Sequence, residues 1–188
     1  MQLDEAIKER KSVKKFTGKE VDWRKVLQAL DYVRFAPMAG NICSVKFLVI
    51  DDKEKIKKIA GACQQPFVYD SSMIIVVVSD RTQVDKMFDY NKKGFAQQQA
   101  GAAIQNLLLG LTEKKIDHCW VGFFDDDLIR EVTKVPASHV IEALVAIGVG
   151  VKIRINKKPK TELENLVFFE KWGNNKMEPE QKVRHHFV

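Results

Sequence analysis

The stretch from Phe95 to Phe124 constrains the fold of this chain more than any other part of the sequence. Its first part, FAQQQAGAAIQNLLLGLTEKK, carries apolar side chains at helical spacing on more than one side. A surface helix needs only one apolar face, so a helix with two is expected to be central. The residues that follow, IDHCWVGFF, are interpreted as a strand. We therefore predict a long central helix that leads through a short turn into a strand.

One face of this helix carries only small side chains, which recur at helical spacing: Ala96, Ala100, Ala103 and Gly110. A second stripe beside it consists of larger apolar residues: Ile104, Leu108 and Leu111. Small side chains let a second helix, or a partner subunit, approach closely. The pattern alone is more typical of an ordinary core helix, and it does not say which chain supplies the close neighbour.

Length and composition predict one globular domain. The chain has 188 residues, of which 45% are hydrophobic and 30% are charged, and these proportions are ordinary for a soluble protein. Its net charge of +6 favours anionic ligands. A nucleic-acid-binding protein would also need a basic cluster interleaved with aromatic residues or a helix-turn-helix, and the sequence indicates neither. The three cysteines lack CxxC spacing, so we expect neither a zinc site nor a disulfide framework.

The apolar runs and the N-terminus bear on where the chain resides. The longest apolar runs are too short to span a bilayer. The N-terminal residues, MQLDEAIKERK, are charged and helix-like rather than typical of a secretory signal. We therefore expect a cytoplasmic protein that does not associate with membranes.

Helices and strands alternate along the rest of the chain. We predict helices over residues 2–11, 22–35, 53–60 and 125–132, and strands over residues 45–50, 73–78 and 140–150. Residues 81–94 are interpreted as a helix or a flap. The run from Met73 to Val78 shows no alternation, as in a strand covered on both faces. The predicted fold is α+β, with a mixed central sheet flanked by helices in a single domain over residues 1–188.

The apolar sides of the first two helices are expected to be buried. In the first helix these are Leu3, Ala6 and Ile7. In the second helix they are Trp23, Val26, Leu27, Leu30 and Val33, with Asp22 as the N-cap.

A run of cations follows the first helix, from Arg10 to Lys15. These cations and the Ser12 hydroxyl surround the apolar Val13 and Phe16. A solvated helix end is the simpler interpretation of such a run. The functional alternative is a phosphate site, because Arg forks, Lys charges and hydroxyl groups suit phosphate oxygens.

A loop rich in special backbone residues, from Phe35 to Asn41, follows the second helix. Pro37 ends helices, while Gly40 and Asn41 permit tight backbone geometry. Such a loop can press its backbone against a flat ligand, and it is equally consistent with an ordinary connection to the next strand.

The order of these motifs resembles that of the nitroreductase family of flavin enzymes. The resemblance covers nearly the whole chain, from about Ile7 to Trp172, and rests on five stretches: RKSVKKF at residues 10–16, APMAGN at 36–41, CWVGFF at 119–124, IGVG at 147–150 and KKPKTELENL at 157–166. Members of this family are α+β homodimers that bind FMN in two equivalent pockets at the subunit interface. The resemblance therefore implies an FMN-dependent homodimer, in which the long central helix belongs to the interface. Residues 152–188 would pack back on the domain or reach across the partner subunit.

The resemblance also implies an activity. It is the transfer of hydride or electrons from NAD(P)H to an organic acceptor such as a nitroaromatic, a quinone or a flavin. An alternative is an FMN-binding carrier or sensor without NAD(P)H-driven turnover. Gly148-Val149-Gly150 lacks the third spaced glycine and the following helix of a Rossmann dinucleotide site.

Carried over by position, the family's motifs imply which residues hold FMN. Arg10, Lys11, Ser12, Lys158 and Lys160 would hold its phosphate and ribityl end. The ring would contact the remaining residues: Lys14 and either Gln64 or Gln65 at the pyrimidine edge, Trp120, Val121 and Gly122 near N5, and Pro37, Met38, Ala39 and Asn41 from the other subunit.

No acid–base side chain is expected, because the flavin carries the chemistry. Lys14 and the Gly122 backbone would tune its electrostatics. The expected walls of the substrate pocket are aromatic: Phe67, Tyr69, Phe88 and Phe95.

The sequence departs from the family pattern at three places. Met38 stands where the family usually has Ser, and Cys43-Ser44-Val45 replaces a frequent Gln-Pro-Trp. Lys11 and Lys160 stand where Arg is common, which keeps the charge but loses the bidentate fork. We therefore expect that the part of the site that contacts the flavin ring differs from that of the family. We also expect weaker binding of the FMN phosphate.

Overall fold

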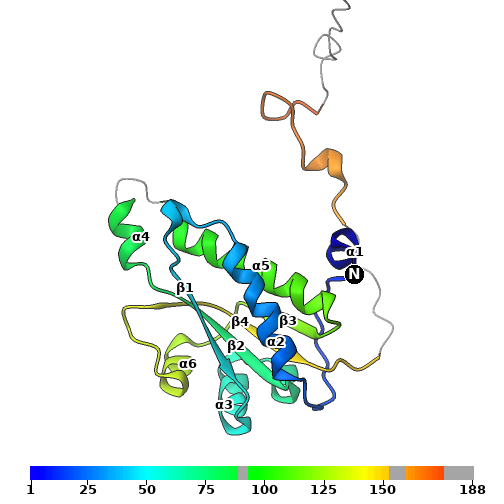
Figure 1. Cartoon of the computed structure of the whole chain (residues 1–188), viewed down its shortest axis with the longest axis vertical. Coiled ribbons are helices and arrows are strands. Elements are labelled where there is room, and N and C mark those ends of the chain that lie inside the picture. The colour runs from blue at the N-terminus through cyan, green and yellow to red at the C-terminus, as the bar shows by residue number, and fades with distance from the viewer. Residues whose placement is uncertain (89–92, 153–159, 176–188) are drawn as a thin grey trace, which may run out of the picture. The chain divides into compact units, whose positions relative to one another are not determined.

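The computed structural model of this protein describes residues 1–88, 93–152 and 160–175. The chain divides into two units, Met1–Lys152 and Ile153–Val188. The first unit contains the whole sheet (Figure 1). In the described part of the second unit, a single 3-10 turn, Leu163–Asn165, precedes a contact between the rings of Phe168 and Trp172, whose centroids lie 4.7 Å apart.

A four-stranded sheet with the order β1-β2-β4-β3 forms the middle of the first unit. The strands are β1 (Val45–Ile50), β2 (Met73–Ser79), β3 (Asp117–Val121) and β4 (Val140–Gly148). Every pairing between these described strands is antiparallel, so the prediction of a mixed sheet was wrong for this part of the chain. The reason lies in the connections, which return to the end of the sheet that they left: β1 ends at Ile50, opposite Ile74 near the start of β2.

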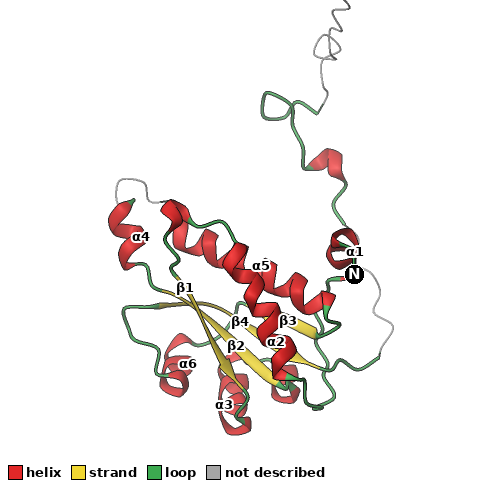
Figure 2. Ribbon diagram, viewed as in Figure 1, coloured by secondary structure: helices red, strands yellow, loops and turns green. Residues whose placement is uncertain are grey.

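Helices cover both faces of this sheet (Figures 1 and 2). On one face lie α5 (Phe95–Glu113) and α2 (Trp23–Leu30), and on the other lie α3 (Lys53–Cys63) and α6 (Asp126–Thr133). The short α1 (Leu3–Glu9) and α4 (Thr82–Met87) belong to the α5 side. Helices on both faces of a central sheet give the α+β fold class that the sequence predicts.

Strand β2 is buried along its whole length, as its apolar run predicts. Ile75 and Val77 pack with the helices α5 and α2, while Ile74 and Val76 pack with α3 and α6. A strand with a helical layer on each side has no polar face, which explains why its sequence shows no alternation.

The small-residue stripe of α5 is buried, and its close neighbour belongs to the same chain. The 3-10 turn Asp31–Phe35, which continues α2, crosses α5 at Gly110. A Cβ atom at Gly110 would lie 3.2 Å from the Ala29 Cα atom. The larger stripe, which includes Ile104 and Leu111, enters the core against the sheet.

The predicted burial of the first two helices was wrong in part. In α1 only Ala6 is buried, whereas Leu3 is 68% exposed and Ile7 is 54% exposed. In α2, Trp23 is 51% exposed and Leu27 is 45% exposed. An amphipathic helix buries only the side that meets a neighbour, and within the first unit the main helical neighbour of both α1 and α2 is α5.

The remaining expectations differ mainly at the ends of elements. The structure confirms β1 at its predicted bounds and Asp22 as the N-cap of α2, where its carboxylate accepts from the Arg24 N–H group at 3.0 Å. Helix α3 extends to Cys63, and the strand after α5 is shorter than predicted. Among the described residues, none of the helices combines the length and the apolar character that a membrane span requires.

Candidate functional site

The cationic segment after α1 is anchored to the edge of the sheet rather than solvated as a free helix end. The Val13 N–H group donates to the His118 carbonyl oxygen at 2.9 Å, and the Val151 N–H group donates to the Lys15 carbonyl oxygen at 2.9 Å. Phe16 forms an antiparallel bridge with Gly150. Since the side chains of Val13 and Phe16 are buried, the polar residues between and before them are fixed in place at the surface.

Arg10, Ser12 and Lys14 belong to the segment that the Val13–His118 hydrogen bond holds beside Cys119 of β3, and we call these three residues the basic cluster. Burial raises the pKa of the Cys119 thiol, while the Lys14 charge, the Ser12 side chain and the Arg10 charge each act to lower it. These effects agree with the backbone hydrogen bond from Val13 to His118, which holds the segment beside Cys119. Lys11 is exposed beside the cluster.

Phe67 lies beside the basic cluster. The Lys14 Nζ atom is 6.0 Å from the centroid of the Phe67 ring, and that ring is 6.2 Å from the ring of Phe16. Tyr69, in the same short 3-10 helix (Pro66–Asp70), is 51% exposed. Lys14, the cation predicted at the pyrimidine edge of the flavin, thus lies beside Phe67, one of the predicted walls of the substrate pocket.

The end of β3 leaves backbone open next to the basic cluster. Val121 is buried in the core, whereas Trp120 is 40% exposed. A Cβ atom built at Gly122 would meet only the Trp120 Nε1 atom, at 3.9 Å. A flat ligand can therefore approach the Gly122 backbone without displacing a side chain.

Both candidate glutamines lie on the same side of the molecule as this open backbone. The Asp125 N–H group donates to the Ala62 carbonyl oxygen at 3.0 Å and so joins the chain after β3 to the end of α3. Gln64 caps α3 in the left-handed conformation and is exposed, and Gln65 is half-buried. The two alternatives, Gln64 and Gln65, both stay open.

The loop from Pro37 to Asn41 is held by a buried glutamine that the sequence analysis did not single out. Gln99 of α5 is 3% exposed. With its amide oriented to satisfy both ends, the nitrogen donates to the Ile42 carbonyl oxygen at 3.1 Å and to Ser44 Oγ at 2.8 Å, and the oxygen accepts from the Ala39 N–H group at 3.0 Å. The loop is thus a fixed feature, in which Gly40 and Asn41 both adopt φ of 57°.

Aromatic and thioether side chains pack against this loop. The rings of Phe88 and Phe95 lie 4.9 Å apart. A Cβ atom at Gly40 would lie 2.7 Å from Met87 Sδ and 3.3 Å from the Phe88 ring. We call the residues of the loop and those around it the loop cluster: Pro37–Asn41, Met87, Phe88, Phe95 and Gln99.

The basic cluster and the loop cluster lie at opposite ends of α5 (Figure 1). Phe95 and Gln99 form the first turns of the helix, and the helix ends at Glu113 just before β3. Its 19 residues span about 28 Å at a rise of 1.5 Å per residue. The structure therefore separates the predicted site residues of one chain into two groups, with Phe67 in one group and Phe88 and Phe95 in the other.

The late basic pair belongs to the second unit. Lys158 lies outside the described residues, and Lys160 is exposed.

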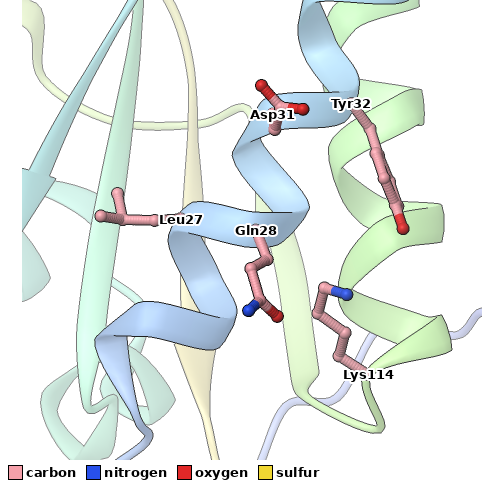
Figure 3. A pocket seen from close by; sticks show the side chains of 5 residues that line it. All are labelled: Leu27, Gln28, Asp31, Tyr32 and Lys114. Atoms are coloured by element: carbon pink, nitrogen blue, oxygen red, sulfur yellow. The ribbon is translucent and has the colours of Figure 1, made fainter.

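A surface hollow of about 500 Å³ lies on the outer side of α2 and α5. Figure 3 shows the side chains that line it, Leu27, Gln28, Asp31, Tyr32 and Lys114, and none of them is a predicted site residue. The Lys114 Nζ atom lies 5.5 Å from the centroid of the Tyr32 ring. The hollow is open, and its single cation, Lys114, lies with the Asp31 carboxylate in the same lining, so we do not assign it to cofactor binding.

Comparison with known proteins gives a consistent result. The profile of the Nitroreductase family matches residues 7–65 and 60–149. A relative from Archaeoglobus fulgidus, provisionally named an NADH dehydrogenase/NAD(P)H nitroreductase, is 26% identical over 144 residues, which cover 74% of this chain and 80% of the relative.

Solved structures agree with this match. A nitroreductase family protein from Clostridium difficile 630 is 26% identical with a TM-score of 0.80, over 91% of this chain and 99% of that protein. A nitroreductase family protein from Clostridium novyi NT is 28% identical with a TM-score of 0.74, over 93% of this chain and 96% of that protein.

Proposed function

This chain belongs to the Nitroreductase family, and on that premise we propose that it is an FMN-dependent oxidoreductase. It would take electrons from NADH or NADPH and pass them to an organic acceptor such as a nitroaromatic, a quinone or a flavin. The observation that carries the proposal is the basic cluster, which gathers next to open backbone at Gly122.

The residues around the basic cluster suit the parts of FMN. Arg10, with the Ser12 hydroxyl, offers the donors and the positive charge that a phosphate group requires. The open backbone at Gly122 suits a flat ring, and Trp120 next to it exposes its indole. Lys11 would add positive charge at the phosphate end.

When bound, FMN supplies the hydride chemistry, and the protein supplies position and electrostatics. Lys14 would stabilise negative charge at the pyrimidine edge of the ring. The Gly122 amide would donate a hydrogen bond near N5. The Phe67 ring lies beside Lys14, with its centroid 6.0 Å from the Lys14 Nζ atom.

We further propose that each flavin site is shared by two chains. The loop cluster of one chain lies at the first turns of α5, whereas its own basic cluster lies beside β3, which follows the other end of that helix. The 19 residues of α5 span about 28 Å. In a two-fold dimer, the loop cluster of the partner subunit would complete the site. The exposed apolar residues of the first unit support such an interface: Leu3, Ile7, Trp23, Leu27 and Phe35.

The activity is tested by an absorption spectrum of the full-length protein with FMN, before and after NADH or NADPH is added without oxygen. We expect a yellow protein whose flavin absorption bleaches with one or both nicotinamides and returns when a quinone or a nitroaromatic is added. A protein that binds FMN but stays yellow would instead be a flavin carrier or sensor. A protein that binds no FMN would contradict the proposed function.

A further inference from the structure

Arg81 joins three elements of the first unit through one side-chain nitrogen. It lies between β2 and α4, and its Nη2 atom donates to Glu142 Oε1 of β4 at 3.0 Å. With the amide of Gln97 oriented to satisfy both of its ends, the Gln97 oxygen accepts from the same Nη2 atom at 2.7 Å. This nitrogen carries two protons, so it can make both bonds. We call Glu142, Arg81 and Gln97 the arginine bridge.

The Glu142 end of the arginine bridge is fixed in the sheet. Glu142 belongs to β4, and its side chain is only 10% exposed. Its Oε1 atom also accepts from Ser79 Oγ of β2 at 2.5 Å. A shielded carboxylate holds its cation firmly, because solvent screens the pair only weakly.

The Gln97 end of the arginine bridge lies at the start of α5. The Gln97 nitrogen donates to the carbonyl oxygen of Gly94, the N-cap of this helix, at 3.3 Å. Arg81 is itself the N-cap of α4, where its carbonyl oxygen accepts from the Asp85 N–H group at 2.8 Å. The arginine bridge therefore ties the start of α4 to the start of α5, and it ties both helices to the sheet.

Helix α4 has little packing of its own. It has six residues, of which Val84 is buried, and Met87 at its end is 54% exposed. The next residue, Phe88, contacts Phe95 of α5, and the centroids of the two rings lie 4.9 Å apart. The spacing of these rings follows from how α4 is placed against α5, and the arginine bridge fixes that placement.

We propose that Arg81 is a positioning residue for the electron acceptor, because through the arginine bridge it sets the placement of Phe88 and Phe95. In the shared site proposed above, the loop cluster would lie beside the flavin ring held by the other chain. Two aromatic rings at a fixed spacing suit a flat aromatic acceptor, which gains by stacking on them. A small inorganic acceptor has no flat face and does not use them. This inference rests on the proposed function and adds a residue that selects among acceptors.

The test compares menadione, a flat naphthoquinone, with ferricyanide as acceptors for the full-length protein loaded with FMN. Gln97→Leu removes one end of the arginine bridge at an exposed position and leaves the Arg81–Glu142 pair intact. We expect kcat/KM for menadione to fall about tenfold, chiefly through KM, as for the loss of an aromatic contact. The values of kcat/KM for ferricyanide and for the nicotinamide should stay unchanged, as should the dissociation constant of FMN.

Two comparisons separate positioning from a general loss of stability. Gln105→Leu makes the same change at another exposed position of α5, and it should leave all of these values unchanged. Arg81→Met should lower kcat/KM for menadione as Gln97→Leu does, and combining the two should cause no further loss, because the arginine bridge is already broken. Equal losses for menadione and ferricyanide in Gln97→Leu, or full additivity of the two substitutions, would overturn the proposal.

A second measurement needs neither FMN nor turnover. NMR of the full-length protein with labelled phenylalanine should show a nuclear Overhauser effect between the rings of Phe88 and Phe95. The effect should persist in Gln105→Leu and weaken in Gln97→Leu. An equally strong effect in Gln97→Leu would overturn the role of Arg81.

The outcomes distinguish this inference from the function on which it rests. A protein that reduces menadione and ferricyanide equally well in every variant contradicts only the role of Arg81. A protein that binds no FMN, or that reduces neither acceptor, contradicts the proposed function itself and this inference with it.

Discussion

The ring of Tyr32 lies so close to Gly110 that a Cβ atom at this glycine would be 2.6 Å from the ring. The side chain of Asn106 adds a hydrogen bond to the Tyr32 carbonyl oxygen at 3.1 Å. This contact joins the turn after α2 to the C-terminal half of the central helix. It also positions the loop cluster, which follows that turn in the chain.

Gly110→Ala should therefore destabilise the protein. The added methyl group forces Tyr32 and the Ala29 backbone away from α5, and such overpacking costs about 1–3 kcal/mol. Urea unfolding measures the change in the free energy of unfolding. Gly101→Ala is the matched control in the same helix, because nothing lies within 4 Å of its Cβ position. It should stabilise the protein by up to about 1 kcal/mol through helix propensity alone. Equal effects of the two substitutions would contradict the contact described above.

Gln99→Leu should loosen the loop cluster. The substitution keeps the volume but leaves the Ala39 N–H and Ile42 carbonyl groups without their partner, at a cost of about 1–3 kcal/mol. Urea unfolding and FMN titration should both report a loss. Gln105→Leu, an exposed position of the same helix, is the control and should leave both values near those of the unaltered protein. A stable Gln99→Leu variant with full FMN affinity would show that the loop does not need this anchor.

The Arg81–Glu142 ion pair should contribute far more than surface pairs. Glu142 Oε1 accepts from Arg81 Nη2 at 3.0 Å and from Ser79 Oγ at 2.5 Å, and its side chain is only 10% exposed. Arg81→Met should cost about 2 kcal/mol, because a shielded carboxylate loses its cation. Lys8→Met breaks an exposed pair with Asp4 and should cost less than about 0.5 kcal/mol. Thermal unfolding of both variants checks the difference, and a null effect of Arg81→Met would refute it.

His118 predicts how stability depends on pH. Its pKa is lowered in the folded protein, chiefly by burial, so the unfolded chain takes up a proton first as the pH falls. The contribution is therefore fully present above the ordinary histidine pKa of 6.5 and is lost as the pH falls below it. The loss is at most about 1.4 kcal/mol per pH unit. Urea unfolding between pH 7 and pH 5, values chosen on the order of one unit either side of that pKa, should show a shallower slope for His118→Gln than for the unaltered protein. Identical slopes would rule out this linkage.

The sequence predicted the positions of helices and strands better than it predicted what packs against them. The apolar runs of β1 and β2 were sufficient to place both strands, and β2, which is buried along its whole length, has the more distinct composition. Leu3 and Trp23 show the limit of the same reasoning. A helical pattern shows which side of a helix is apolar, but it does not show whether the same chain covers that side.

Contacts between distant parts of the chain account for the other differences. The helices between the strands gave no indication of whether each connection crosses the sheet or returns to the same end, so the antiparallel pairing was missed. Gln99 lies in a run of three glutamines, and its partner Ser44 is 55 positions away. Periodicity does not distinguish the buried glutamine from its exposed neighbours. The cations and the hydroxyl of residues 10–16, in contrast, are close together in sequence, so the sequence alone showed that they lie near one another, and their role in binding FMN stays a prediction.

The central claim is that one flavin site combines the basic cluster of one chain with the loop cluster of another. Two variants of the chain, each altered in one of these two clusters, test this claim. Arg10→Glu reverses the charge in the basic cluster, and Gly40→Val places a branched side chain at a positive φ against Met87 in the loop cluster. Each variant alone should bind FMN poorly.

The decisive measurement is the FMN content of the mixed dimer, isolated through a different tag on each chain. In a shared site, one of the two pockets receives both changes and the other receives neither. The mixed dimer should therefore regain FMN in about half of its sites, and that flavin should bleach with NADH or NADPH. A mixed dimer that remains without flavin would contradict a site shared between chains.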